Sequence, residues 1–320
     1  MKFLSTFIVG LLFPWYLCAQ QVPDTSFTFP IRQTAYQKGE GPVIYIDQAH
    51  HNMHTMSGNF YAFSKLLIED GYRVQPLVSY IRTPDVLSGC KVLVIANALH
   101  YSNLQNWTLP TPSAFSKEEI SVIKKWVKNG GSLLLIADHM PFAGAAFNLG
   151  KSFGFEFING FAFIIEKTWP PILFSLEDQT LEQSLITKGL KDYEQIDQVA
   201  TFTGSAFYAP DLAIPVLSFQ ENGITFQPDT AWQFNEWTPW ENLERYHQGA
   251  IRKFGRGKIA VFGEAAMFTA QIVNDTLPVG FNSPFAPQNA QFTLNLIHWL
   301  DGVKEYQGDI RIDQNVDHSK

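Results

Sequence analysis

Three apolar runs constrain the fold of this chain more than any other feature of its sequence. They are VIYID at 43–47, KVLVIANAL at 91–99 and SLLLIAD at 132–138. All three are rich in Val, Ile and Leu without polar alternation, which is typical of parallel strands with both faces covered. A fourth run, YRVQPLV at 72–78, is less purely apolar and fits a strand nearer the edge. The chain is therefore expected to contain an α/β sheet.

Helical patterns separate these runs. The first has Phe60 and Phe63 on its apolar face. The second begins at the capping-box pair Ser116 and Glu119 and ends at Asn-Gly-Gly, 129–131. Together with the four strands, the two helices predict a β-α-β-β-α-β order, which indicates a doubly wound, mostly parallel sheet.

The second half of the chain has a different texture. From about 155 to 250 Phe, Trp and Pro become more frequent, helical periodicity fades, and short strand candidates appear at 199–207 and 213–219. HQGAIRKF and KIAVFGEAAMF then flank a hairpin signal, Gly-Arg-Gly at 255–257, and a last helix is predicted from 289 to 300. We therefore predict an elaborated, partly antiparallel second half.

The amino-terminal 19 residues have the pattern of a secretory signal peptide. Lys2 precedes an apolar run that ends at Leu17 and is followed by Ala19, and the run is short for a membrane span. An uncleaved anchor is one alternative. A lipoprotein at Cys18 is another, although Leu17 is bulky where a small residue is expected. We expect a periplasmic or secreted protein, with no stable membrane insertion after cleavage.

The mature chain is predicted to be a single α/β domain at 41–302, preceded by an extension at 20–40 and followed by a polar tail at 303–320. Lys2 is the only charge in the leader, so its removal takes the formal net charge from −7 to −8. Nucleic acid and anionic membranes are poor partners for such an acidic protein. Cys90 is then the only cysteine, which excludes an intramolecular disulfide.

Three segments resemble the class I glutamine amidotransferase-like superfamily, in particular its exported bacterial branch that carries a domain of unknown function. They are GGSLLLIADH, GRGKIAVFGEAAMF and NLIHWLDG, and the resemblance covers roughly 40–302. It implies a flavodoxin-like three-layer sandwich. Amidotransferase activity requires a cysteine nucleophile after a strand. The corresponding turn reads Asp138-His139-Met140, and Cys90 precedes its strand, so we expect no such activity.

Acidic, amide and imidazole side chains follow four of the predicted strands. In an open α/β sheet, ligands bind beyond the carboxyl ends of the strands where the strand order reverses. In a flavodoxin-like order that point lies between the first and third strands. The predicted catalytic residues are Asp47, His54, Asp138, His139 and Glu264. The predicted substrate contacts at this edge are His50, His51, Asn97 and His100.

Each of these residues also has a structural interpretation. Asp47 could bind backbone amides of its loop, Asp138 with its neighbour could cap the next helix, and Glu264 could cap the segment that follows it. His50 and His51 could be solvated loop residues. The coincidence across four strands, rather than any single residue, carries the prediction of a site.

A carboxylate beside several imidazoles could hold a divalent metal such as zinc. The candidate ligands are His50, His54 and His139. His50 and His54 have the spacing of ligands on a helix, although Gly58 indicates that the helix begins later. Without a metal, Asp138 could orient a histidine as general acid or base, since an unperturbed imidazole pKa of about 6.5 suits that role.

A tryptophan-rich block at 230–249 gives an indication of the substrate. Trp232, Trp237 and Trp240 lie within nine residues, beside Glu236 and Glu241. Indole faces flanked by hydrogen-bonding groups can hold a sugar ring. Alternatively, the rings clamp a long loop onto the sheet, because large aromatic side chains bury much area.

Two functions therefore stay open on the sequence. One is an exported hydrolase acting on a carbohydrate or glycan-derived substrate. The other is a non-catalytic module that binds a glycan or a protein.

Overall fold

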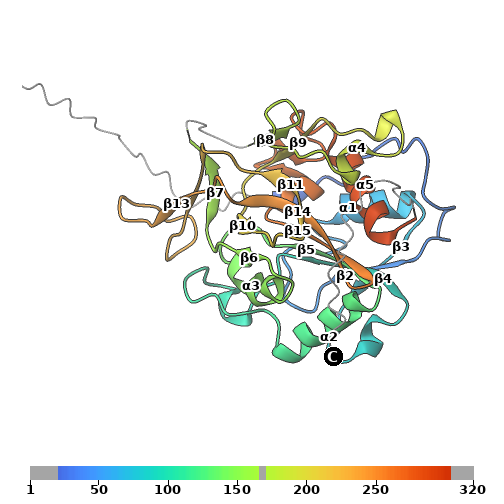
Figure 1. Ribbon diagram of the computed structural model, residues 1–320, viewed down its shortest axis with the longest axis horizontal. Helices are drawn as coiled ribbons and strands as arrows, with labels where there is room; N and C mark the ends of the chain where they lie inside the picture. The colour runs from blue at the N-terminus through green and yellow to red at the C-terminus, as the bar shows by residue number, and fades with distance from the viewer. Residues whose placement is uncertain (1–20, 166–170, 304–320) are drawn as a thin grey trace, which may run out of the picture.

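The computed structural model describes residues 21–165 and 171–303. The predicted signal peptide and nearly all of the predicted polar tail lie outside these residues. The described chain is a mixed α/β structure with one large sheet and smaller antiparallel sheets (Figure 1). No helix in the described part of the chain is long and apolar enough to cross a membrane.

Five parallel strands form one half of the large sheet, in the order β3-β2-β4-β5-β15. Their bounds are β2 Val43–Asp47, β3 Arg73–Leu77, β4 Cys90–Ala96, β5 Ser132–Ile136 and β15 Gly257–Phe262. The four apolar runs of the first half therefore form strands as predicted, although β4 and β5 end earlier than the runs do. Because the chain passes from β2 to one neighbour and then returns to the other, the strand order reverses between β2 and β4.

Antiparallel strands continue the sheet beyond β15. They are β14 His247–Phe254, β10 Phe207–Tyr208 and β6 Glu156–Phe157, and β11 Ile214–Ser218 also pairs with β14. The predicted hairpin is present, because Phe254 of β14 pairs with Gly257 of β15. The second half is thus partly antiparallel, as its composition indicated.

Helices cover both faces of this sheet (Figure 1). Their bounds are α1 Tyr61–Glu69, α2 Lys117–Lys128, α3 Phe142–Ser152, α4 Leu185–Lys188 and α5 Asn289–Asp301. The predicted capping box of Ser116 and Glu119 begins α2, and Gly302 ends α5 in the left-handed conformation at φ +81°. That conformation favours glycine because it has no Cβ.

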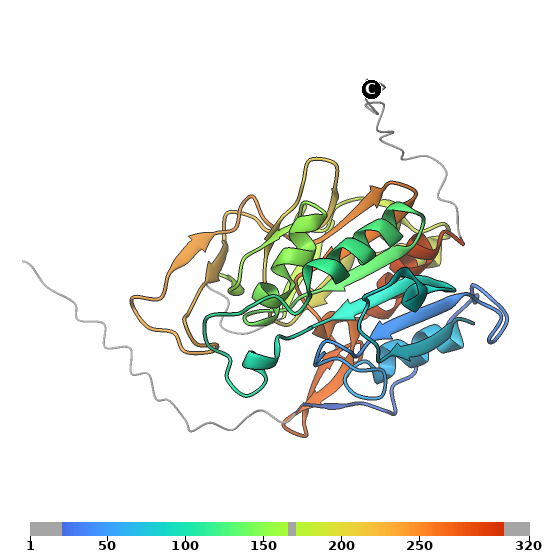
Figure 2. The ribbon, with the colours of Figure 1, turned by 90° about the horizontal axis from the view of Figure 1, so that it is seen from below.

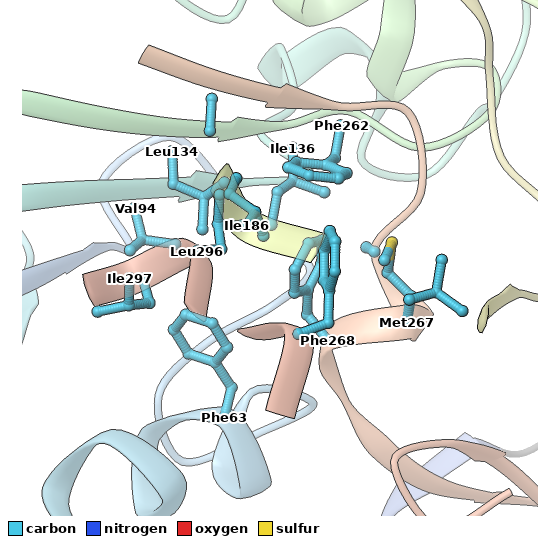
Figure 3. Close-up of a cluster of buried hydrophobic side chains, with 14 of the residues drawn as sticks. Phe63, Val94, Leu134, Ile136, Ile186, Phe262, Met267, Phe268, Leu296 and Ile297 are labelled. Atoms are coloured by element: carbon cyan, nitrogen blue, oxygen red, sulfur yellow. The ribbon is translucent and has the colours of Figure 1, made fainter. Parts of the chain in front are cut away.

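Alternation along β4 divides the core between the two faces. Val92 and Val94 belong to the cluster that includes α1, α4 and α5, whereas Leu93 and Ile95 belong to the cluster that includes α2 and α3. Figure 3 shows the first cluster, in which labelled side chains from α1, α4, α5 and the strands fill one space. Burying each large apolar side chain contributes about 1.5–3 kcal/mol, so both helix layers are held firmly on the sheet.

Three smaller sheets complete the fold. Their strands are β1 Gln21–Pro23, β16 Ala270–Val273 and β17 Leu277–Gly280; β7 Phe161–Ile164, β12 Gly223–Phe226 and β13 Trp240–Asn242; and β8 Ile172–Ser175 and β9 Gln198–Thr201. The sheet of β7, β12 and β13 projects from one side of the molecule and, together with the loop 227–239 that joins β12 to β13, is called the arm below (Figures 1 and 2).

Candidate functional site

The order of the parallel strands brings the predicted site residues to one edge of the sheet. β2, β4, β5 and β15 are consecutive neighbours, and Asp47, Asn97, Asp138 and Glu264 lie at or just beyond their carboxyl ends. All four side chains are buried. The hydrogen bonds divide these residues and their histidines into two groups with different chemistry.

The first, called the His50 group, consists of Asp47, His50 and Glu119. His50 Nδ1 lies 2.8 Å from Asp47 Oδ2, and His50 Nε2 lies 3.1 Å from Glu119 Oε1. Burial opposes a charge on the ring, but the hydrogen bonds and charges of the two carboxylates outweigh it and raise the pKa of His50. The imidazolium is therefore the form that donates to both partners.

The His50 group is a structural tie between the end of β2 and helix α2. Asp47 Oδ1 also accepts from the Ala49 amide at 3.2 Å, as the structural interpretation of Asp47 supposed. Glu119 Oε1 accepts from the Ile81 amide at 3.1 Å. Because both nitrogens of His50 face carboxylates, neither is free for a metal or a substrate, and we retain neither role for His50.

The second, called the His54 group, consists of His54, Asn97 and Asp138. Asn97 links the other two: its Oδ1 accepts from the Asp138 amide at 2.9 Å, and its Nδ2 lies 3.2 Å from His54 Nδ1. The Asp138 amide can only donate, so it fixes the orientation of the Asn97 side chain. Nδ1 of His54 must then accept, and the proton of the neutral ring lies on Nε2.

Burial makes His54 the opposite of His50 in charge. It lowers the pKa of His54 to about 4, although the nearby charge of Asp138 opposes this fall. The ring packs on Phe60, with the centroids 5.0 Å apart, and Phe60 belongs to the cluster of α1 and α5. At neutral pH His54 is therefore an uncharged hydrogen-bond donor through Nε2.

Asp138 is a carboxylate with one oxygen in use. Its Oδ1 accepts from the His139 amide at 2.7 Å, and Oδ2 has no hydrogen bond to another described residue. The side chain does not cap helix α3, which has no side-chain cap. The alternative that Asp138 caps the next helix is therefore not observed.

Glu264 caps the short helix η4, Ala266–Phe268, as its structural interpretation supposed. Its two oxygens accept from the amides of Ala266 and Met267, at 2.8 and 2.7 Å. Burial, and then the charge of Asp138, raises the pKa of Glu264 well above its usual value, although the amide donors oppose this. Because the side chain has no exposed surface, we do not retain it as a group that touches a substrate.

His139 lies in an aromatic wall beside this group. Its ring stacks on Phe161, with centroids 4.5 Å apart, and meets Trp232 edge to face at 4.8 Å. Nδ1 donates to the Met140 carbonyl at 2.6 Å, so Nε2 of the neutral ring is an acceptor. Trp107, in the segment between β4 and α2, also lies near the His139 ring, with the ring centroids 6.0 Å apart.

The remaining predicted contacts lie outside both groups. His51 is exposed, with φ +50°. His100 accepts from the Ser102 amide and caps the short helix η2, Tyr101–Asn103. Trp237 and Trp240 are exposed on the arm, at 82% and 62%, and therefore do not clamp the loop onto the sheet.

The predicted metal set does not fit this arrangement. Within residues 21–165 and 171–303, no three His, Cys, Asp or Glu side chains are placed to hold a metal ion. His50 packs on Phe115 in the cluster of α2 and α3, whereas His54 packs on the opposite face of the sheet. The spacing of these two histidines is that of helical ligands, but they lie in a loop before α1, which begins at Tyr61.

Cys90 begins β4, at the amino edge of the sheet. Burial raises the pKa of its thiol to about 12, so it is unreactive at neutral pH.

Sequence reasoning missed Glu119 and Phe161 as neighbours of the site. Glu119 was identified only as half of a capping box, because nothing local indicates that its second oxygen reaches His50. Phe161 belongs to a run of aromatic residues without a distinguishing signal. Both contacts depend on tertiary packing.

No protein-family model matches the sequence, and no curated protein matches it. Among solved structures, the mmIFT52 N-terminal domain is similar over 84% of this chain and 100% of that chain, with a TM-score of 0.57 and 18% identity. A ThuA-like protein from Bacteroides uniformis has a TM-score of 0.46 at 12% identity, covering 85% and 94% of the two chains. A cytoplasmic protein from Salmonella typhimurium has a TM-score of 0.43 at 13% identity, covering 81% and 98%. The likeness to the IFT52 domain concerns the fold alone.

Proposed function

We propose that this protein is an exported hydrolase acting on a carbohydrate or glycan-derived substrate, with its reacting groups in the His54 group. The observation that carries the proposal is the Asn97 bridge, which holds a neutral imidazole donor and a carboxylate at one strand edge. The same proposal assigns the chain to the exported amidotransferase-like branch with a flavodoxin-like sandwich and a periplasmic or secreted location. A small molecule or glycan is the expected ligand.

The two reacting groups have complementary roles. Asp138 Oδ2 accepts a proton from the water that attacks the acyl carbon, and it returns this proton to the leaving alcohol oxygen when the acyl–oxygen bond breaks. His54 Nε2–H donates a hydrogen bond to the oxygen on which negative charge develops. A neutral imidazole suits this second role. The side-chain amide of Asn97 donates to Nδ1 of His54, so the single proton of the ring lies on Nε2.

These roles favour cleavage of an acyl bond, such as a sugar ester, over cleavage of a glycosidic bond. Glycosidic cleavage needs a carboxylic acid that protonates the leaving oxygen. Glu264 has the raised pKa of such an acid, but its oxygens are bound to amides and its side chain is wholly buried. His139 Nε2 and Trp232 would contact the sugar ring, since both lie in the aromatic wall.

The test is hydrolysis by the purified mature chain of acetylated sugars and aryl esters, compared with aryl glycosides. We expect acetate or nitrophenol release from the esters, and a loss of about 10²–10⁴-fold in kcat/KM for Asp138→Asn. His54→Gln is expected to lose about 10²–10³-fold, because one donor to the oxyanion is removed.

Two exposed residues provide matched controls. Asp211→Asn removes a carboxylate far along the chain from the site, and His51→Asn keeps a residue type that tolerates the left-handed backbone at 51. Both should retain full activity and fold. No turnover of any ester by the folded wild type would reject the acyl-hydrolase proposal.

A non-catalytic module that binds a glycan or protein is the second candidate. It is favoured by the fact that Asp47, Glu119 and Glu264 are all committed to internal hydrogen bonds, which leaves Asp138 as the one carboxylate of these four with a free oxygen. Ligand binding without turnover, unaffected by Asp138→Asn, would support it.

A further inference from the structure

Two tryptophans of the arm are largely exposed to solvent. Trp237 is 82% exposed and Trp240, the first residue of β13, is 62% exposed. Tryptophan side chains are on average largely buried in folded proteins, so two exposed rings within four residues indicate an interaction surface. The arm projects away from the main sheet on one side of the molecule (Figures 1 and 2).

A cluster of phenylalanines performs the packing instead. Phe234 lies edge to face against Phe161, at 5.2 Å, and Phe163, at 6.1 Å, and it also contacts Phe226 at 5.8 Å. Phe161 and Phe163 belong to β7 and Phe226 to β12. The segment that bears the exposed tryptophans is therefore anchored on the arm, so the two rings are presented on a fixed base.

Trp232 joins the arm to the strand-edge site. Its ring lies 4.6 Å from Phe161 and 4.8 Å from His139, while 47% of the side chain is exposed. Its φ of +65° is rare for a large residue and is unfavourable, so tertiary contacts must offset the strain. The Ala231 amide also donates to the Trp107 carbonyl at 2.8 Å, which ties the arm to the loop after β4.

We propose that Trp237 and Trp240 form an outer binding platform for an extended glycan chain whose reacting residue lies beside Trp232 and His139. The proposal rests on the hydrolase function above and specifies its substrate as an oligomer or polymer rather than a single sugar. One stretch of nine residues would then contact several successive sugars, with Trp232 nearest the reacting groups.

The neighbours of the two rings favour a glycan over a protein. Exposed polar residues surround them in the sequence, including Asn235, Glu236 and Asn242. The core of a protein interface is depleted in charged residues, whereas the exposed carboxylate of Glu236 is directly adjacent to Trp237. An aromatic face between hydrogen-bonding groups matches a sugar ring with its hydroxyls.

The experiment is native affinity electrophoresis of the mature chain in gels that contain soluble xylan, β-glucan, mannan or pectin. We expect retardation of the wild type by at least one polymer, and a loss of affinity on the order of tenfold for Trp237→Ala and for Trp240→Ala. Phe285→Ala, which removes another half-exposed aromatic ring outside the arm, should bind as the wild type does. Equal migration in all gels, or unchanged binding by both tryptophan variants, would overturn the proposal.

Further arms of the experiment separate this proposal from the proposed function. Asp138→Asn should keep polymer binding while it loses turnover. Tryptophan-dependent binding without any turnover would reject the hydrolase and leave the platform standing. Turnover of short esters and polymers alike, with no effect of the tryptophan variants, would reject the platform and leave the hydrolase. A dimer that dissociates on Trp237→Ala, measured by light scattering, would assign the surface to a second copy and overturn the glycan platform.

Discussion

His50 and His54 lie four residues apart in one loop, yet their surroundings give them opposite charge states. His50 lies between two carboxylates, which raise its pKa. His54 lies against Phe60 and the amide of Asn97, and burial lowers its pKa to about 4. One ring is therefore a structural cation, and the other is a neutral donor beside the Asp138 carboxylate.

Burial alone does not decide what a histidine does. Both rings are almost completely buried, at 1% and 5% exposure. A buried imidazole becomes charged where acidic partners accept from both nitrogens, and it stays neutral where an amide donates to one of them. In this protein, the second environment leaves Nε2 free for chemistry.

The largest expected effect is a difference in the free energy of unfolding between the His50→Gln and His54→Gln variants. His50→Gln leaves Asp47 and Glu119 without their cation, and breaking a buried ion pair costs about 3–5 kcal/mol. His54→Gln loses one hydrogen bond and part of the contact with Phe60, which should cost about 1–2 kcal/mol. Urea unfolding of both variants at pH 7 measures the difference.

A smaller loss of unfolding free energy for His50→Gln than for His54→Gln would contradict the assignment of His50 as the structural cation. His51→Asn is the matched control in the same loop, because its exposed side chain should change the free energy of unfolding by less than about 0.5 kcal/mol.

Much of the main sheet could be predicted from the sequence because its signals are local. The apolar runs predicted the bounds of β2 and β5 to within two residues, and the capping box predicted the start of α2. The arm could not be predicted, because β7, β12 and β13 are short and pair across long sequence separations. Their register depends on aromatic packing around Phe234, which leaves no periodic pattern.

The candidate site was predictable as a place rather than as a mechanism. Residues that follow neighbouring parallel strands must meet at one edge, so Asn97 and Asp138 could be paired in advance. The partners of His50 and His54 could not, because each ring turns toward a different face of the sheet. Helical spacing suggested a shared metal, but the two residues lie in a loop and have different neighbours.

The pH dependence of stability gives the next effect. The pKa of His54 is about 4 in the folded state and about 6.5 when unfolded, so the unfolded chain binds the proton more readily. The stabilisation by His54 is thus complete above pH ~6.5 and is lost as the pH falls toward 4, by roughly 3 kcal/mol in all. In a curve of unfolding free energy against pH, His54→Gln should remove this acid limb, the fall in stability below pH ~6.5.

His50 should show the opposite limb. Because its folded pKa is raised, its stabilisation is complete below the unfolded pKa of about 6.5 and is lost as the pH rises through the folded value. Subtracting the curve of each variant from the wild type separates these limbs from the titration of carboxylates such as Glu264. Two difference curves of the same sign would refute the opposed charge states.

The smallest effect in energy is the most specific, and it concerns the proton on His54. Asn97→Asp keeps an acceptor for the Asp138 amide and a residue type that tolerates φ +49°, but it replaces the donor that faces His54 Nδ1 with an acceptor. The neutral ring should then carry its proton on Nδ1, and the added charge should raise its pKa. Two-bond ¹⁵N–¹H NMR of the histidine side chains measures both changes.

The wild type should show a single proton on Nε2 of His54, whereas His50 should be protonated on both nitrogens in the wild type and in the variant. In Asn97→Asp, Nε2 of His54 becomes an acceptor, so the oxyanion donor is lost while the protein stays folded, and ester hydrolysis should fall about as far as in His54→Gln. A wild-type proton on Nδ1 would mean that the Asn97 amide is turned the other way. His54 would then present an acceptor to the substrate, and the roles proposed for His54 as oxyanion donor and Asp138 as general base would have to be exchanged.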